Sequence, residues 1–218
     1  MPEDVAPHFS LLSTTAVSDA LDRLGIAGQA EGIKPLDRSF RMAGRAFTIR
    51  YQPVDVNGGT VGDYIDDVPP GAVVALDNAG RLDATVWGDL LTTVAHTRGL
   101  AGTVIDGVCR DSPRSLELGY PIFSRSSYMR TGKDRVQVAA VGDPITIGQV
   151  RVRADDIILA DADGVVVVPA ERCGEVLAAA EDIDRAERGI RALILQGRRL
   201  DQARAEFGYH DLQHHVTG

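Results

Sequence analysis

The stretch WGDLLTTVAHTRGLAGTVIDGVCRD, residues 87–111, holds the pattern that decides the fold. Its first half is amphipathic, with apolar residues between Leu90 and Ala95 on one face of a helix of about 3.6 residues per turn. Arg98 and Gly99 then form a typical helix end, a cation in the last turn followed by a glycine. This half therefore predicts a helix that begins near Trp87.

The second half predicts a buried strand that brings two charged side chains to a sheet edge. Residues 103–105, Thr-Val-Ile, are all β-branched, which is typical of a strand covered on both faces. Residues 106–107, Asp-Gly, are predicted to turn the chain, so that Arg110 and Asp111 follow at the carboxyl edge. Because ligands of open α/β sheets bind at that edge, we expect the chemistry there.

The remaining chain alternates helices and strands and then becomes mostly strand. Helices are predicted at residues 12–25, 61–67 and 112–118 and from about residue 170, and strands at residues 44–51, 72–76, 121–123, 136–141, 145–152, 157–160 and 165–168. Residues 77–81 are predicted as a turn and residues 124–133 as a loop. The C-terminal helix carries an apolar stripe at Val176, Ala180, Ile183, Ala186, Ile190 and Leu193, and a polar tail begins at about residue 208. Because the chain has no repeat and no clear linker, we expect one α/β domain over residues 1–218.

Composition narrows the class of protein. A formal net charge of −8 argues against a nucleic-acid-binding surface. No stretch approaches the roughly 20 apolar residues of a membrane span, and the opening MPEDVAPHFS has no secretory pattern. Cys109 and Cys173 are too few for a disulfide framework. These features predict a cytoplasmic protein that binds neither membrane nor nucleic acid.

Several chemistries lack their sequence signatures. There is no G-x-G-x-x-G after a strand, no P-loop and no G-x-S-x-G elbow. The only lysines, Lys34 and Lys133, have polar, glycine-flanked surroundings, which argues against a Schiff base. The five histidines lack zinc-like spacing: the terminal pair His214 and His215 is best interpreted as solvated, and His96 as a surface or interface residue. A bound metal would then have carboxylate and water ligands, as Mg²⁺ or Mn²⁺ prefers.

Asp89, Arg110 and Asp111 remain as candidates for chemistry. Leu90 and Leu91 would present backbone N–H groups at the same helix start, where a substrate carboxylate can bind. Two structural alternatives stay open at this point. The helix dipole alone favours a carboxylate at Asp89, and the Arg-Asp pair could be an ordinary surface ion pair.

Four motifs together resemble one known family. They are GDLL (residues 88–91), GVCRD (residues 107–111), ADADGVVVVP (residues 160–169) and STTAVSDALDRLG (residues 13–25). The family contains the divalent-metal 4-hydroxy-4-methyl-2-oxoglutarate / 4-carboxy-4-hydroxy-2-oxoadipate aldolases and the regulator of ribonuclease activity A with its relatives. The resemblance implies a layered α/β/β/α swivelling-type fold with a central mixed sheet and a long C-terminal helix. Members are often labelled as methyltransferases, but no glycine-rich cofactor loop supports that activity here.

For the aldolase branch, the resemblance implies a role for each candidate. Asp111 would ligate Mg²⁺ or Mn²⁺ directly. The substrate's pyruvyl carboxylate would bind the backbone at Gly88, Leu90 and Leu91. Arg110 would stabilise the charge on the 2-oxo oxygen as a pyruvate enolate forms.

The resemblance also implies that the site is shared between subunits. Asp89 would orient metal-bound waters, and Glu187 from the C-terminal helix of a neighbouring subunit would do the same. The expected assembly is a homotrimer or a hexamer of paired trimers. The alternative interpretation is that Glu187 is an ordinary glutamate on the solvated face of its helix and has no role in the site.

One position departs from the family pattern. The aldolases carry a further acidic residue three positions after the aspartate of the Arg-Asp pair, and this chain has Arg114 there. The non-enzymatic regulators tend to lose the metal-binding aspartate, whereas this chain keeps Asp111. The sequence therefore favours a metal-dependent aldolase that releases pyruvate from 4-hydroxy-2-oxo di- or tricarboxylic acids, with oxaloacetate decarboxylation as a side activity. The alternative is a non-catalytic oligomeric regulator that binds a ribonuclease or another protein.

Overall fold

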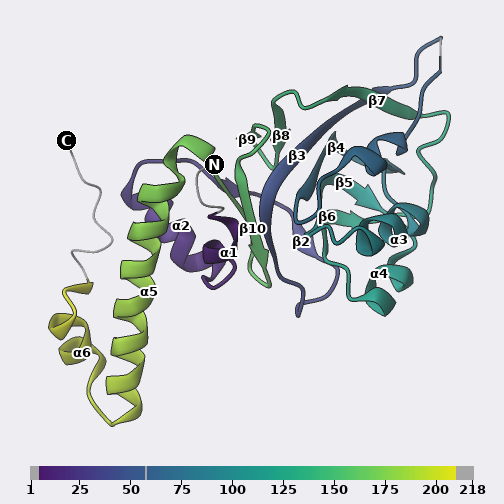
Figure 1. Ribbon diagram of the computed structural model, residues 1–218. Coiled ribbons are helices and arrows are strands. Elements are labelled where there is room, and N and C mark those ends of the chain that lie inside the picture. Colours follow the sequence, from purple (N-terminus) through teal and green to yellow (C-terminus); the bar gives the residue numbers. More distant parts are fainter. Residues whose placement is uncertain (1–4, 57, 210–218) are drawn as a thin grey trace.

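A computed structural model describes residues 5–56 and 58–209, which form a mixed β-sheet with helices on its outer sides (Figure 1). The helices are α1 (Ala6–Phe9), α2 (Thr14–Arg23), α3 (Asp89–Thr97), α4 (Ser112–Leu118), α5 (Cys173–Leu195) and α6 (Leu200–Glu206), with 3₁₀ helices η1 (Asp63–Asp67) and η2 (Ala170–Arg172). The strands are β1 (Gln29–Ala30), β2 (Lys34–Pro35), β3 (Met42–Pro53), β4 (Val73–Thr85), β5 (Gly102–Cys109), β6 (Ile122–Ser127), β7 (Val136–Val141), β8 (Ile145–Ile147), β9 (Val150–Val152), β10 (Ile157–Asp161) and β11 (Gly164–Val168).

The long strand β3 joins the two halves of the sheet. The strand order is β1-β11-β10-β3-β4-β5-β6-β2, and β7 also pairs with β3. The first residues of β3 pair antiparallel with β10, and its last residues pair antiparallel with β7. Between them, β3 runs parallel to β4, and β4, β5 and β6 continue in parallel. The parallel half places the carboxyl ends of these strands together, and the candidate site lies there.

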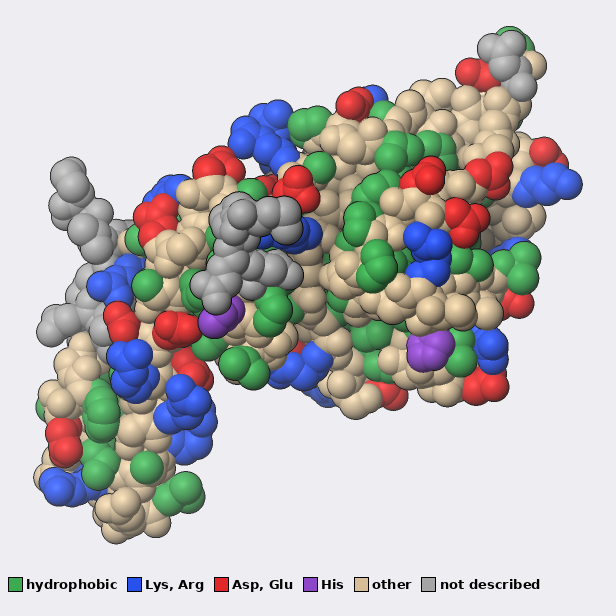
Figure 2. Space-filling view, in the orientation of Figure 1, with side chains coloured by type: hydrophobic (Ala, Val, Ile, Leu, Met, Phe, Trp, Pro, Cys, Tyr) green, Lys and Arg blue, Asp and Glu red, His purple; other side chains and the backbone are tan. Residues whose placement is uncertain are grey.

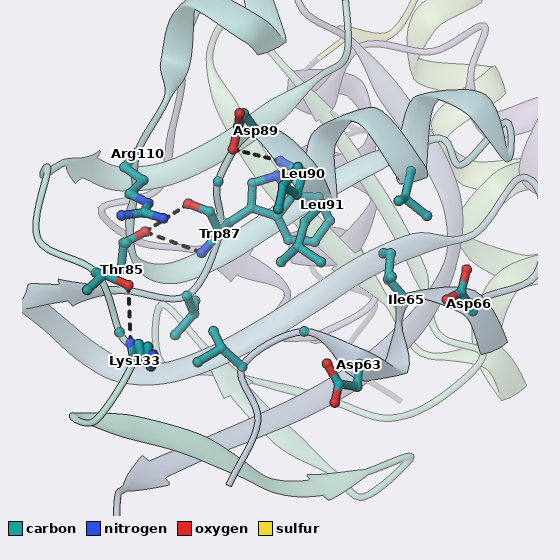
Figure 3. Close-up of a pocket in the computed structure, with 17 residues that line it drawn as sticks. Asp63, Ile65, Asp66, Thr85, Trp87, Asp89, Leu90, Leu91, Arg110 and Lys133 are labelled. Carbon is teal, nitrogen blue, oxygen red and sulfur yellow. Dashed lines mark hydrogen bonds between the residues drawn. The ribbon is translucent and has the colours of Figure 1, made fainter.

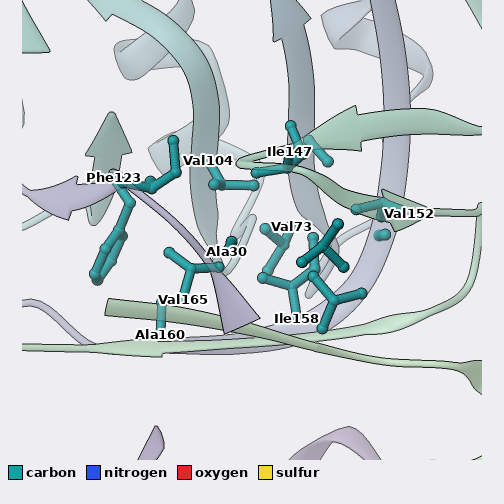
Figure 4. Packing of buried hydrophobic residues seen from close by; sticks show 14 of the residues in the cluster. Ala30, Val73, Val104, Phe123, Ile147, Val152, Ile158, Ala160 and Val165 are labelled. Atoms are coloured by element: carbon teal, nitrogen blue, oxygen red, sulfur yellow. The ribbon is translucent and has the colours of Figure 1, made fainter. Parts of the chain in front are cut away.

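Alternate residues of the buried strands face different cores, which gives four layers. Val73 of β4 and Ile158 of β10 contact an inner core between the two halves of the sheet (Figure 4). Val74 of β4 packs with residues of α3 and η1, whereas Ile157 of β10 packs with residues of α2 and α5. The layers therefore follow the order α/β/β/α, each half of the sheet being covered on both faces. This confirms the predicted α/β fold with a central mixed sheet and a long C-terminal helix.

The predicted helices at both ends of the chain are confirmed. Ser13 caps α2, because its hydroxyl accepts a hydrogen bond of 3.1 Å from Ala16 N. The stripe predicted on α5 is buried except at Leu193, which is half-buried near the helix end. Within the described ranges, no helix is long and apolar enough to cross a membrane. The predicted polar tail lies mostly outside those ranges.

The predicted turn at residues 77–81 is wrong, because β4 continues through it to Thr85. The register between β4 and β5 shifts within this stretch. Ala79 and Gly80 take positive φ values of 53° and 67°, so they account for an irregularity within the strand rather than a chain reversal. The strand continues because Asp77 and Arg81, on either side of these residues, pair with Asp106 and Gly107 of β5.

Three further predictions need correction. Residues 106–107 do not turn the chain but lie within β5, whose residues are all buried. The predicted loop at residues 124–133 is partly strand, because β6 runs to Ser127 beside β5. The single strand predicted at residues 145–152 is the hairpin β8–β9. Its two-residue loop, Gly148 and Gln149, has φ values of 51° and 72°, as tight hairpins require.

Candidate active site

The start of α3 and the end of β5 are held side by side at the parallel edge of the sheet. Arg110 N donates a 3.0 Å hydrogen bond to Trp87 O. The buried Thr85 hydroxyl lies 2.9 Å from Trp87 O and 3.0 Å from Val108 O, and it accepts a hydrogen bond from Trp87 N. These hydrogen bonds hold the start of α3 beside the end of β5. They are made by backbone atoms and the Thr85 hydroxyl, so none of them uses the side chain of Asp89, Arg110 or Asp111.

Trp87 anchors this junction in the core. Its side chain is almost completely buried, and its indole N–H donates to Thr92 Oγ1 at 2.9 Å. Its ring stacks on Tyr120 with a centroid distance of 6.3 Å. Burial raises the pKa of Tyr120, which keeps this phenol neutral. The first turn of α3 thus rests on a rigid aromatic support.

Asp111 lies directly against the start of α3. Its Oδ2 accepts a 3.2 Å hydrogen bond from Asp89 N and lies 3.3 Å from Arg110 Nε. The backbone of Asp111 is left-handed, with φ at 56°, a conformation that aspartate tolerates better than most residues. A Cβ at Gly88 would lie 2.8 Å from Asp111 Oδ2, so only glycine permits this approach. The structure therefore brings Gly88, Asp89, Arg110 and Asp111 together.

The helix start is capped by the protein's own carboxylates. Leu90 N donates a 2.9 Å hydrogen bond to Asp89 Oδ1, while Asp111 holds the amide of Asp89. A substrate carboxylate that binds Leu90 N would therefore replace the Asp89 oxygen. Leu91 N follows in the same first turn, and its side chain lines the adjacent cavity. The expected carboxylate-binding amides thus lie beside the acidic residues.

A cavity of about 390 Å³ opens beside these groups (Figure 3). One wall comes from the start of α3 and from Arg110, and another from η1. The lining residues are Val61, Gly62, Asp63, Ile65, Asp66, Thr85, Val86, Trp87, Gly88, Asp89, Leu90, Leu91, Val94, Arg110, Thr131, Gly132 and Lys133. The cavity therefore has an apolar middle and charged ends, a combination that suits a small organic anion.

Sequence reasoning missed Lys133 and the acidic wall. The polar surroundings of Lys133 argue against a Schiff base, yet its side chain lines the cavity. Asp63 and Asp66 enter from η1, more than twenty positions before α3. The rarity of lysine, with only Lys34 and Lys133 in the chain, was the one signal that could have drawn attention to it.

Glu187 does not lie in this site within one chain. It belongs to α5, which packs against α2 at the opposite end of the molecule from α3 (Figure 1). There its carboxylate accepts a 3.3 Å hydrogen bond from the Tyr209 hydroxyl. Any contribution of Glu187 to the site would have to come from another copy, and that role stays a prediction.

Arg114 lies beside the site but does not line the cavity. Its Nε donates to Thr93 Oγ1 at 3.2 Å, and its Nη1 pairs with Glu117 at 2.9 Å. The guanidinium of Arg114, which stands where the aldolases have an acidic residue, therefore contacts α3 through Thr93 and α4 through Glu117. Nothing in this arrangement directs it at a substrate.

The oxygen ligands at the site fit a hard divalent cation. The carboxylate of Asp111 accepts a hydrogen bond from the backbone N of Asp89, whose own residue lines the cavity, and the Asp111 side chain is 39% exposed. Within the described residues, no three His, Cys, Asp or Glu side chains converge as a metal cage. Mg²⁺ commonly binds through one or two carboxylates and several waters, so these residues suit a hard cation such as Mg²⁺ or Mn²⁺.

The neighbouring cysteine offers no competing chemistry. Cys109 directly precedes Arg110, but its side chain is buried among Ser124, Ser126 and Ser127. Burial raises the pKa of this thiol, so the thiolate is scarce at neutral pH. The site is therefore one of carboxylates, amides and cations.

The region that carries this arrangement matches a known protein family. Residues 14–167 match the sequence profile of the RraA-like family, described as Aldolase/RraA. This chain belongs to the RraA-like family. The shared region spans α2 through β11 and includes Gly88, Asp89, Arg110 and Asp111.

The proteins to which this chain is similar differ in name and size. Protein DlpA of Legionella pneumophila is 40% identical over 200 residues, which are 90% of this chain but only 32% of DlpA. The chain thus spans about a third of that relative. The "Putative 4-hydroxy-4-methyl-2-oxoglutarate aldolase" of Halalkalibacterium halodurans is 34% identical over 76% of this chain and 77% of its own. RraAS2 of Streptomyces coelicolor, described as an unusual member of the RNase ES inhibitor RraA protein family, superposes with a TM-score of 0.78 at 28% identity, over 86% of this chain and 96% of its own.

Proposed function

We propose that this chain is a divalent-metal-dependent aldolase that cleaves 4-hydroxy-2-oxo acids to pyruvate, with oxaloacetate decarboxylation as a side activity. The observation that carries the proposal is the contact of Asp111 with both Arg110 and the start of α3 at the edge of a cavity. The aldolase name of the Halalkalibacterium relative supports the reaction class. Asp111 would hold Mg²⁺ or Mn²⁺ directly and Asp89 would hold it through water, and the metal, when bound, would polarise the 2-oxo group as a Lewis acid.

The chain's own residues account for the remaining tasks. Backbone N–H groups of Leu90 and Leu91 orient the pyruvyl carboxylate. The C4 hydroxyl loses its proton, the C3–C4 bond breaks, and its electrons form the enolate of pyruvate while a carbonyl product leaves. Arg110 stabilises the negative charge on the enolate oxygen. Asp89 orients a water that carries the proton, which finally returns to C3.

Pyruvate release from oxaloacetate tests the site. We expect release with Mg²⁺, loss with EDTA, and a fall of roughly 100-fold or more in Asp111→Asn. Asparagine tolerates the left-handed backbone at this position, so the fold should persist. Asp143→Asn is the matched control, since Asp143 is an exposed aspartate paired with Arg50 away from the cavity. Full activity in Asp111→Asn would refute the assignment of the site.

The second candidate is a regulator that acts through a protein partner. The likeness to Streptomyces RraAS2, which is described as belonging to a family of RNase inhibitors, favours it. This function predicts no metal-dependent turnover and a binding partner that Asp111→Asn does not affect. Activity that depends on Asp111 would decide in favour of the aldolase.

A further inference from the structure

A buried hydroxyl lies between the two segments that carry the candidate site. Thr85 ends β4 and is 3% exposed, and its Oγ1 lies 2.9 Å from Trp87 O and 3.0 Å from Val108 O. The same oxygen accepts a 3.2 Å hydrogen bond from Trp87 N (Figure 3). Trp87 stands two positions before Asp89, and Val108 stands two positions before Arg110. The hydroxyl therefore joins the start of α3 to the end of β5 just before the side chains proposed for catalysis.

The main chain of Thr85 is itself fixed by the segment between β6 and β7. Thr85 N donates a 3.0 Å hydrogen bond to Arg130 O, and Thr85 forms a β-bridge with Thr131. Gly132 lies so close to this strand end that a Cβ there would clash with Thr85 O. Because these contacts hold the main chain of Thr85, its hydroxyl stays in place between Trp87 and Val108.

The two segments would stay together without this hydroxyl, but their relative position would change. Arg110 N also donates a 3.0 Å hydrogen bond to Trp87 O, and that bond does not depend on Thr85. The buried amide of Trp87, however, would lose the hydroxyl as its acceptor, and the carbonyl of Val108 would lose it as a donor. We therefore expect a small displacement between α3 and Arg110 rather than unfolding.

We propose that Thr85 is a positioning residue that sets the distance between Arg110 and the start of α3. This inference rests on the proposed aldolase function. In that reaction the substrate carboxylate binds to the amides of α3, whereas Arg110 acts on the oxygen that gains charge as the enolate forms. A displacement between the two leaves carboxylate binding in place and weakens stabilisation of the transition state. kcat should therefore fall while KM changes little.

Two substitutions of Thr85 separate the hydroxyl from the methyl group. Thr85→Val keeps the shape of the side chain and removes the hydroxyl, and Thr85→Ser keeps the hydroxyl. With oxaloacetate and Mg²⁺, we expect kcat for pyruvate release to fall roughly ten- to a hundredfold in Thr85→Val, with less than about a threefold change in KM. In Thr85→Ser we expect kcat to stay within about threefold of the wild-type value.

Thr14→Val is the matched control for the loss of a buried hydroxyl. Thr14 belongs to α2 and does not line the cavity, and its buried hydroxyl donates to Asp161 at 2.6 Å. This variant should lower the melting temperature and leave kcat unchanged. An equal fall of kcat in Thr14→Val and Thr85→Val would show that destabilisation accounts for the loss, and would overturn the proposal.

The wild-type protein separates the other possible failures. If it released no pyruvate in the presence of Mg²⁺, the proposed function and this inference would fail together. With an active wild type, an unchanged kcat in Thr85→Val, or an equal loss in Thr85→Val and Thr85→Ser, would refute the positioning role alone. If Thr85→Val does not fold, Thr85→Ala takes its place, and equal kcat values for Thr85→Ala and Thr85→Ser would refute the role in the same way.

Discussion

At the scale of single residues, the site depends on Gly88, whose lack of a side chain leaves room for Asp111 and Arg110. Gly88 has an ordinary negative φ of −148°, so its backbone does not require glycine. The requirement comes from space, because Asp111 Oδ2 and Arg110 Nε lie within 2.8 and 3.3 Å of the position of a Cβ. The two charged groups can therefore reach the start of α3 only across a glycine.

Gly88→Ala should displace these two side chains while leaving the fold in place. Since small displacements of catalytic groups cost up to about a hundredfold in rate, we expect pyruvate formation to fall by roughly ten- to a hundredfold. Steady-state kinetics with a thermal melt would measure this. Gly174→Ala, near the start of α5, meets no atom within 4 Å and should keep full activity. Equal activity of the two variants would contradict the argument.

At the scale of elements, a buried carboxylate fixes α2 to the sheet. Asp161 ends β10, and its carboxylate accepts hydrogen bonds from Thr14 N at 2.9 Å, Thr14 Oγ1 at 2.6 Å and Asp163 N at 3.0 Å. Arg41 approaches within 3.9 Å. The first turn of α2 is thereby held against the outer core that α5 completes.

Asp161→Asn should destabilise the protein more than loss of the adjacent helix cap. The new amide would turn a donor toward groups that already donate, so we expect a loss of about 2–3 kcal/mol in the free energy of unfolding. Ser13→Ala removes only the cap and should cost about 1 kcal/mol. Urea unfolding of both variants provides the measurement. A smaller loss in Asp161→Asn than in Ser13→Ala would show that Asp161 does not fix the helix.

At the scale of the whole molecule, the candidate site and α5 lie at opposite ends. Figure 1 shows α5 extending beyond the sheet with α6 folded back beside it, far from α3. The face seen in Figure 2 intermixes acidic and basic side chains and shows no continuous basic stripe. A role for Glu187 at the site therefore requires a second copy.

Mixed oligomers test whether subunits share the site. Asp111→Asn and Glu187→Gln chains should each be inactive alone, and together they should regain up to about a quarter of wild-type activity, because random assembly pairs an intact Asp111 with an intact Glu187 at that frequency. Pyruvate release after unfolding and joint refolding measures this. The double variant, treated in the same way, is the control. Full activity of Glu187→Gln alone would place Glu187 outside the site, and mixtures that remain inactive while wild-type protein recovers would show that the two residues do not combine between chains.

The sequence by itself predicted the main helices and strands and the residues that meet at the candidate site. Buried runs such as Thr103-Val104-Ile105, the stripe of α5 and the Arg110–Asp111 pair are local patterns whose period or order identifies strands, helices and a sheet edge. Local signals failed where pairing with neighbours overrides them. Residues 77–81 and 106–107 have turn-forming side chains but lie in strands, because Asp77 and Arg81 of β4 pair with Asp106 and Gly107 of β5.

Only the tertiary structure decided which side chains line the cavity of the candidate site. Lys133, Asp63 and Asp66 come from segments with no distinctive pattern, and they reach the cavity because β3, β4 and β7 place η1 and the β6–β7 segment beside α3. Arg114 shows the reverse, since its sequence position pointed to the substrate whereas its contacts are with Thr93 and Glu117. Proximity across the chain depends on long-range packing, which no local run of residues encodes.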